Sequence, residues 1–189
     1  MRIAYVHGYD GVTGPLLLGA CLDAGVALTR VQEGWCQLHL PAVQVSCVRV
    51  ACREFMATQV TGTLPQAIAF LPQQSYPALV DFLERSDAPT AIKQCVLHML
   101  RRFVEAVARV HGVTDGGELA LRSAFLPEVL YLGSGVAYAL EELTVAQVMA
   151  APVPLSTGCI AEAEGRRPLP HPLTVALSRD VPVYGKGRR

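Results

Sequence analysis

The chain has 189 residues, of which 51% are hydrophobic and 17% are charged, and equal numbers of basic and acidic side chains give a formal net charge of zero. This length suits one domain with a well-buried core, and the composition argues against a disordered chain. A neutral chain offers no broad basic surface to phosphates, so we expect no nucleic-acid partner.

The apolar composition raises the question of a membrane segment. A spanning helix needs about 20 consecutive apolar residues, and the best candidate, residues 143–155, is interrupted by a glutamine and two prolines. At the N-terminus, His7 and Asp10 interrupt any signal-peptide core. We therefore expect no membrane association and a cytoplasmic location.

The first third of the chain is predicted to alternate strands and helices. Residues 2–7 read as a short buried strand, followed by a glycine loop and a helix that begins near Thr13 or Gly14 and stops at Gly25. This helix is apolar nearly all round, which predicts burial on most sides. A second helix is expected over 28–38, with Trp35 packed inward. Strands are expected over 42–50 and 54–60, and residues 61–75 read as a linker or exposed loop.

The clearest element is a helix over about 88–111. Its apolar residues recur every three or four positions and make one stripe, Ser86 or Asp87 can cap it, and Gly112 ends it. On another face Arg101, Glu105 and Arg109 lie four residues apart and can form ion pairs. Further elements are expected as helices over 127–143 and 172–178 and as strands near 118–122, 145–150 and 158–163.

These elements predict an α+β fold in which helices pack on a mixed β-sheet, with residues 1–189 forming a single compact domain. Six cysteines are scattered through the chain without a Cys-x-x-Cys pair. Because free cysteines behave as small core hydrophobes, we expect most of them to be buried.

The loop between the first strand and the first helix is the main candidate site. Gly8, Gly11 and Gly14 lead into a helix N-terminus, where backbone N–H groups favour an anion. The loop lacks both the Gly-Lys-Ser/Thr ending and the Gly-x-Gly-x-x-Gly fingerprint of nucleotide-binding loops. A plain tight turn and a ligand-binding loop both stay open. The candidate ligand-binding residues are His7, Asp10, Gly11, Thr13 and Gly14.

The remaining histidines give weaker signals. Cys95 and His98 share a helical face, but two ligands do not complete a zinc or nickel site. His171 lies in a rigid Pro-Leu-Pro-His-Pro-Leu segment and is a secondary candidate. No serine or cysteine nucleophile is accompanied by its base and orienting acid. The residues alone therefore predict neither a metal site nor a catalytic residue, and an enzyme using His7, Asp10 and Thr13 is the weakest hypothesis.

Several stretches, taken in order, resemble the LarC family of nickel insertion proteins, which load nickel into a pyridinium bis-thiocarboxylate (nickel pincer) nucleotide. The opening strand, the glycine loop and the first helix resemble the start of that family, and the proline-rich region resembles a later part. The matching stretches are Ile3–Val6, Gly11–Gly14, Leu17–Val26, Ala108–Val113, Ala151–Gly158, Gly165, Leu169–Thr174 and Val181–Gly185.

The chain departs from the family pattern at polar positions. His7 and Pro15 stand where members carry acidic residues, and residues 73–76 replace a histidine-rich run. The family's His-x-His-Glu segment aligns with Leu119–Arg122, which leaves few of the lone pairs that a nickel ion needs. The resemblance thus implies a degenerate relative that binds rather than catalyses.

The resemblance also implies cofactors and partners. The family is associated with a CTP-dependent nickel-inserting (cyclometallase) reaction in a C-terminal domain that has no counterpart in these 189 residues. We expect CTP and a divalent metal only with that domain, and nickel only by resemblance. The expected partners are the pincer nucleotide, a full-length relative or a second copy. The alternative hypothesis is a non-catalytic partner or oligomerisation module.

Overall fold

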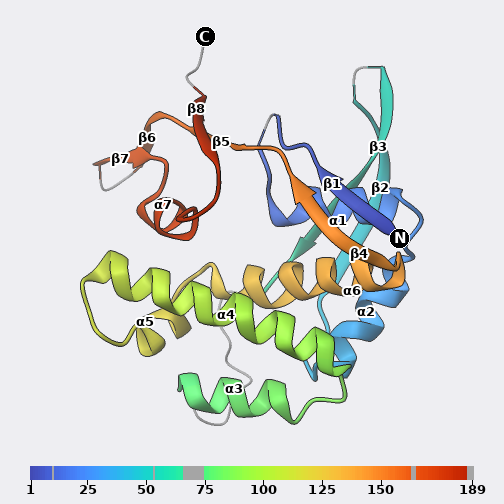
Figure 1. Ribbon diagram of the computed structural model, residues 1–189, viewed down its shortest axis with the longest axis horizontal. Coiled ribbons are helices and arrows are strands. Elements are labelled where there is room, and N and C mark those ends of the chain that lie inside the picture. Colours follow the sequence, from blue (N-terminus) through green and yellow to red (C-terminus); the bar gives the residue numbers. More distant parts are fainter. Residues whose placement is uncertain (10, 53, 66–74, 163–164, 187–189) are drawn as a thin grey trace.

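The computed structural model describes residues 1–9, 11–52, 54–65, 75–162 and 165–186 (Figure 1). The helices are α1 (Gly14–Asp23), α2 (Leu28–Gln37), α3 (Tyr76–Glu84), α4 (Thr90–His111), α5 (Gly117–Leu121), the π-helical segment η1 (Glu128–Gly133), α6 (Ser134–Glu142) and α7 (Pro172–Leu177). The strands are β1 (Arg2–Val6), β2 (Gln44–Cys52), β3 (Phe55–Thr63), β4 (Val145–Ala150), β5 (Val153–Ser156), β6 (Gly158–Glu162), β7 (Gly165–Leu169) and β8 (Val183–Lys186).

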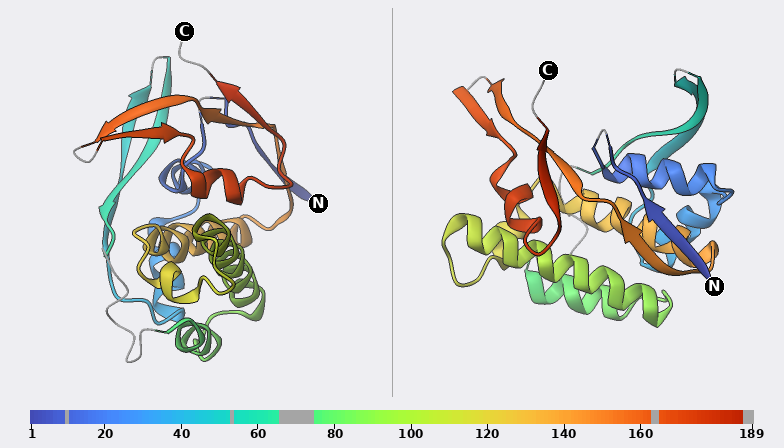
Figure 2. Two further views of the ribbon diagram at one scale, coloured as in Figure 1. Left: turned by 90° about the vertical axis from the view of Figure 1, so that its left-hand side faces the viewer. Right: turned by 45° about the horizontal axis from the view of Figure 1, so that its top comes forward.

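The α+β class is confirmed, and the strands form separate pairs rather than one continuous mixed sheet. Within the described ranges, β1–β4 and β5–β8 are parallel pairs, whereas β2–β3 and β6–β7 are antiparallel. Helix α1 packs against β3 and α6. At Gly19 of α1 an added Cβ would lie 2.5 Å from the Thr58 carbonyl oxygen, so this glycine lets helix and strand meet closely. The helix thereby lies between the hairpin and the β1–β4 pair (Figure 2).

Helix α4 supplies the largest part of the core. Its predicted apolar stripe is confirmed, because Ile92, Val96, Leu100 and Phe103 are each at most 3% exposed. The predicted caps are wrong: the helix begins after Pro89, the Ser86 hydroxyl donates to the Leu83 carbonyl, and Asp87 pairs with His39. The end is as predicted, since Gly112 has a left-handed φ of 67°.

A buried pair of aromatic residues joins α2 to η1. Trp35 Nε1 donates to the Tyr131 carbonyl at 2.8 Å, and the two rings meet edge to face at 5.7 Å. The Tyr131 hydroxyl donates to the Pro41 carbonyl at 3.0 Å. The prediction that Trp35 packs inward is therefore confirmed, and the predicted helix over 127–143 is present with a π-helical first part.

Several local predictions are wrong. Residues 117–121 form α5 instead of a strand, because Asp115 Oδ1 accepts from Gly117 N and starts a helical turn whose Ala120 and Leu121 enter the core. Of the predicted linker, residues 61–63 belong to β3, and 66–74 lie outside the described residues. Helix α1 is less buried than its composition predicts, since Leu16 is 62% exposed. Most cysteines are also exposed, at Cys36, Cys47, Cys52, Cys95 and Cys159.

The described helices were also compared with the requirements of a membrane span. None of them combines the length and the apolar character that crossing a bilayer demands.

Replacing Tyr131 with phenylalanine tests the aromatic connection. Loss of the hydroxyl leaves the Pro41 carbonyl without this donor and should lower the free energy of unfolding at neutral pH by about 1 kcal/mol. Burial raises the pKa of Tyr131 to about 12, whereas an unfolded tyrosine ionises near about 10. The neutral hydroxyl therefore contributes fully below about pH 10, and this contribution is lost as pH rises towards about 12.

Urea denaturation at increasing pH provides the measurement. The stability difference between the original chain and Tyr131→Phe should shrink above about pH 10. The matched control is Tyr184→Phe, whose ring is 40% exposed on β8. A difference that stays constant across this pH range would contradict the account.

Candidate functional site

The loop after β1 is a tight turn held by its own backbone. Gly11 N donates to the Gly8 carbonyl at 3.0 Å, and Gly11 has a φ of 109°, a conformation that L side chains rarely adopt. The loop then enters α1 at Gly14, where an added Cβ would lie 2.8 Å from Leu132 Cδ1. Gly11 is therefore required by its backbone conformation, and Gly14 by its close contact with Leu132. Asp10, a candidate ligand residue, lies outside the described residues.

The N-terminus of α1, which adjoins the loop, carries polar groups of Thr13 and of the helix backbone. Thr13 is the N-cap residue, but its hydroxyl makes no capping hydrogen bond, and its carbonyl accepts from Leu17 N at 3.0 Å. The first turn of α1 contains no acidic side chain. The exposed Thr13 hydroxyl can therefore contact a ligand with acceptor atoms, and of the first three residues of α1 only Gly14 and Leu16 carry an N–H, because Pro15 has none.

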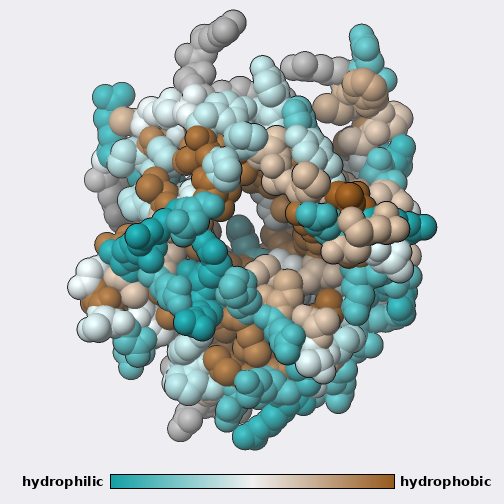
Figure 3. Space-filling model, viewed as in Figure 1, coloured by the Kyte–Doolittle hydropathy of each residue, from teal (hydrophilic) through white to brown (hydrophobic). Residues whose placement is uncertain are grey.

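A mainly apolar hollow of about 430 Å³ lies beside this loop, between β1, β4, α1 and α6. Figure 3 shows the molecule hollowed near the middle of one face, with hydrophobic residues on the side of β1 and β4. His7 and Gly11 border the hollow, whereas Thr13, Gly14 and His171 do not. The lining residues are Ala4, Tyr5, Val6, His7, Gly8, Gly11, Val12, Leu16, Leu17, Ala20, Cys21, Ala24, Val136, Leu140, Leu143 and Val148.

Three aromatic rings follow one another along β1 and its loop. The Tyr5 and His7 ring centroids are 6.4 Å apart at an interplanar angle of 22°, and those of His7 and Tyr9 are 6.2 Å apart at 7°. β1 ends at Val6, so strand alternation accounts for the side on which Tyr5 lies, whereas His7 and Tyr9 belong to the loop. Tyr5 is 61% exposed and Tyr9 is 64% exposed. The rings thus follow the exposed side of β1 and its loop, and Tyr5 and His7 lie at the border of the hollow.

The Cys21 thiol in the hollow is a poor metal ligand while it is protonated. Burial raises the pKa of the Cys21 thiol above its ordinary value, and the thiolate is the form that coordinates metals. Across the part of the chain that the structure describes, no three His, Cys, Asp or Glu side chains are grouped so as to hold a metal ion.

His171 has a structural position. It is the N-cap residue of α7, where its Nδ1 accepts from Leu173 N at 3.1 Å, and its ring meets Phe125 edge to face at 5.6 Å. The structure therefore does not bring this secondary candidate to the hollow.

The sequence predicted that Arg101 and Arg109 pair with Glu105, and the structure pairs Glu105 with Arg101 but directs Arg109 to the Ala176 carbonyl. The grouping of Arg109 with Arg102 and Arg179 was missed. Arg102 and Arg109 lie seven residues apart on α4, a spacing that signals one shared helical face. Arg179, which lies near Arg102 in the structure, is 77 residues further along the chain. Only the shared helical face of Arg102 and Arg109 could have been recognised from their spacing in the sequence.

Comparisons with known proteins give a consistent result. The family model described as "Nickel insertion protein" matches residues 4–189. A "Putative nickel insertion protein" of Thermomicrobium roseum is 33% identical over 183 residues, covering 94% of this chain and 43% of that protein. A protein of Geobacillus kaustophilus named "Pyridinium-3,5-bisthiocarboxylic acid mononucleotide nickel insertion protein" is 26% identical over 195 residues, covering 97% of this chain and 46% of that protein. The chain thus spans slightly less than half the length of these relatives, and no solved structure gives a significant match.

The loop geometry predicts opposite results for two neighbouring substitutions. Gly11→Ala forces a side chain into the left-handed region and should lower the free energy of unfolding by about 1–2 kcal/mol. Thr13→Ala should change it by less than about 0.5 kcal/mol, although removing a working N-cap residue typically costs about 1 kcal/mol. Chemical denaturation of both variants checks this. A large loss from Thr13→Ala would show that the hydroxyl caps α1.

Proposed function

This chain belongs to the nickel insertion protein family, and we propose that it takes part in assembling a nickel-pincer cofactor by binding the pyridinium mononucleotide rather than by catalysing metal insertion itself. One observation carries the proposal: Tyr5 and His7, whose rings stack on each other, are among the residues that border the apolar hollow beside the glycine loop, and Tyr5 lies where the hollow meets the exposed face of β1. Nickel is a substrate in this scheme. We place the chain in the cytoplasm, as a metallochaperone-like binding component.

The chemistry of a pyridinium ring fits this hollow. The ring is flat and positively charged, so it stacks on aromatic faces and is attracted to their negative π-surface. Val6, Leu17 and Leu140 supply apolar walls that exclude water from the ring. Carboxylate or thiocarboxylate groups on the ring would be favoured near the first N–H groups of α1.

The proposal of binding without catalysis is supported by α5. This helix stands at the position of the His-x-His-Glu segment of the LarC pattern. Ala120 and Leu121 are 1% and 8% exposed, and both pack in the core. Hydrocarbon at these positions offers no lone pair to nickel. In this proposal CTP, its divalent metal and the insertion chemistry are not assigned to any of these 189 residues.

Titration with pyridinium-3,5-bisthiocarboxylic acid mononucleotide tests the proposed function. We expect calorimetry to detect binding to the original chain and an affinity about tenfold lower for Tyr5→Ala, because stacking on an aromatic ring contributes about 1–3 kcal/mol. Tyr184→Ala removes another exposed tyrosine ring, from β8, which does not border the hollow, and this variant should bind the mononucleotide normally. Absence of heat, or equal affinities of the two variants, would refute the proposed site.

A second candidate function, an oligomerisation module, is favoured by the outer face of the β1–β4 pair. Tyr5 and Met149 are direct partners in this pair, and they are 61% and 48% exposed. Ile3, two residues before Tyr5 on the same strand face, is 50% exposed. A contiguous apolar face of this kind is typical of a protein interface, and a second copy of this chain is the occupant we propose.

Sedimentation velocity tests this second candidate. The original chain should form a dimer that Met149→Lys dissociates, because the substitution would bury an unpaired charge in the interface. Met56→Lys is the control, since Met56 is 53% exposed on the β2–β3 hairpin. A stable monomer of the original chain would exclude the module.

A further inference from the structure

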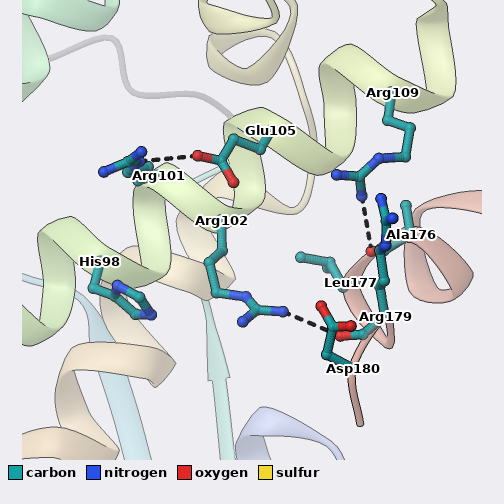
Figure 4. Close-up of a pocket in the computed structure, with 9 residues that line it drawn as sticks. All are labelled: His98, Arg101, Arg102, Glu105, Arg109, Ala176, Leu177, Arg179 and Asp180. Carbon is teal, nitrogen blue, oxygen red and sulfur yellow. Dashed lines mark hydrogen bonds and ion pairs between the residues drawn. The ribbon is translucent and has the colours of Figure 1, made fainter.

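A polar groove separates α4 from the chain segment that contains α7. His98, Arg102, Glu105 and Arg109 recur every three or four residues, so they share the face of α4 that lies away from its buried stripe. This face meets α7 and the two residues Arg179 and Asp180 that follow it (Figure 4). Between them is a pocket of about 280 Å³, called the α4–α7 groove below.

Two arginines of the groove are held in place by neutral acceptors. Arg102 Nη2 donates to the Arg179 carbonyl at 3.3 Å, and Arg109 Nη1 donates to the Ala176 carbonyl at 3.3 Å. Each contact uses one of the five N–H donors of a guanidinium group. Because carbonyl oxygens carry no formal charge, these contacts orient the side chains and leave their positive charges uncompensated.

The groove has an excess of positive charge. Four arginines line it, including Arg101, against the two carboxylates of Glu105 and Asp180. Arg101 Nε and Glu105 Oε1 form an ion pair at 2.9 Å, which removes one charge of each sign. The formal balance of these lining side chains is +2 with His98 neutral, in a chain whose net charge is zero. The groove is therefore a local positive field on a neutral molecule.

We propose that the α4–α7 groove binds a small phosphate-bearing anion, such as a diphosphate or the phosphate group of a nucleotide. Guanidinium groups match phosphate oxygens with paired N–H donors, and the resulting charge-assisted hydrogen bonds are stronger than neutral ones. Small-molecule pockets usually measure about 300–1,000 Å³, and the groove, at about 280 Å³, is slightly smaller, which suits a compact anion. This site goes beyond the proposed function, because it shares no lining residue with the hollow beside β1.

A purely structural role makes a different prediction. Arg109 donates to a carbonyl in the last turn of α7, and this contact alone could tie the segment to α4. A substitution of the Arg179 side chain distinguishes anion binding from the structural role. Its backbone carbonyl takes part in the contact with Arg102, and that carbonyl survives replacement of the side chain. Arg179→Gln therefore removes a charge from the groove and keeps both anchoring contacts.

Isothermal titration with sodium pyrophosphate tests the proposal on the full chain. Binding to the original chain should weaken as salt is raised, because ions screen charges in an exposed site. Arg179→Gln should bind at least about tenfold more weakly. Glu105→Gln should bind more tightly, since it removes a repelling carboxylate. The control Arg85→Gln removes an exposed arginine that pairs with Asp81 on α3, and its affinity should be unchanged.

Any one of three results would overturn the proposal of an anion site. Absence of binding to the original chain refutes the site, and equal affinities for the original chain and Arg179→Gln leave the arginines with the structural role only. Tighter binding of a single-stranded oligonucleotide than of pyrophosphate, lost in Arg179→Gln, would assign the groove to nucleic acid instead. Pyrophosphate has no pyridinium ring, so its binding and the Tyr5→Ala titration succeed or fail independently.

Discussion

The burial of one face of α4 is the constraint on which the rest of the structure depends. Because Ile92, Val96 and Phe103 are turned into the core, the arginines of the same helix must face outward. η1 and α6 pack against α4, and the Trp35 hydrogen bond to Tyr131 then attaches α2 to this group. One helix therefore fixes both the interior and the position of the charged α4–α7 groove.

Close backbone contacts place α1 and create the hollow beside β1. Gly19 allows α1 to approach the backbone of β3, and Gly14 allows its first turn to approach Leu132 of η1. The opposite side of α1, with Leu16 and Leu17, then faces β1 across an open space. Residues that would be core in a fully covered helix become the apolar walls of the hollow that we propose as a binding site. The close contacts at Gly14 and Gly19 thus fix the position of α1 and leave the apolar hollow beside β1.

Periodicity predicted the long elements and failed where the chain distances are large or the segments short. The helix that ends at Gly112 and the inward position of Trp35 follow from local patterns, and the structure confirms them. The strand before His7 is present but is not buried as predicted, since Ile3 and Tyr5 are 50% and 61% exposed. The two leucines of α5 alternate as in a strand, but the hydrogen bond from Gly117 N to Asp115 and the burial of Ala120 and Leu121 in the core favour a helix. The exposure of Leu16 depends on what covers α1, and the meeting of Arg102 with Arg179 joins residues 77 apart. Neither the exposure of Leu16 nor the contact between Arg102 and Arg179 can be predicted from a local sequence pattern.

Amide chemical-shift mapping by NMR tests the central claim most directly, namely that the hollow beside the glycine loop receives the pyridinium ring. On addition of the pincer mononucleotide, the account predicts that the largest shifts fall at Tyr5, His7, Gly11 and the first turn of α1. Shifts confined to elements that do not border the hollow, such as α3 and the β2–β3 hairpin, would contradict it.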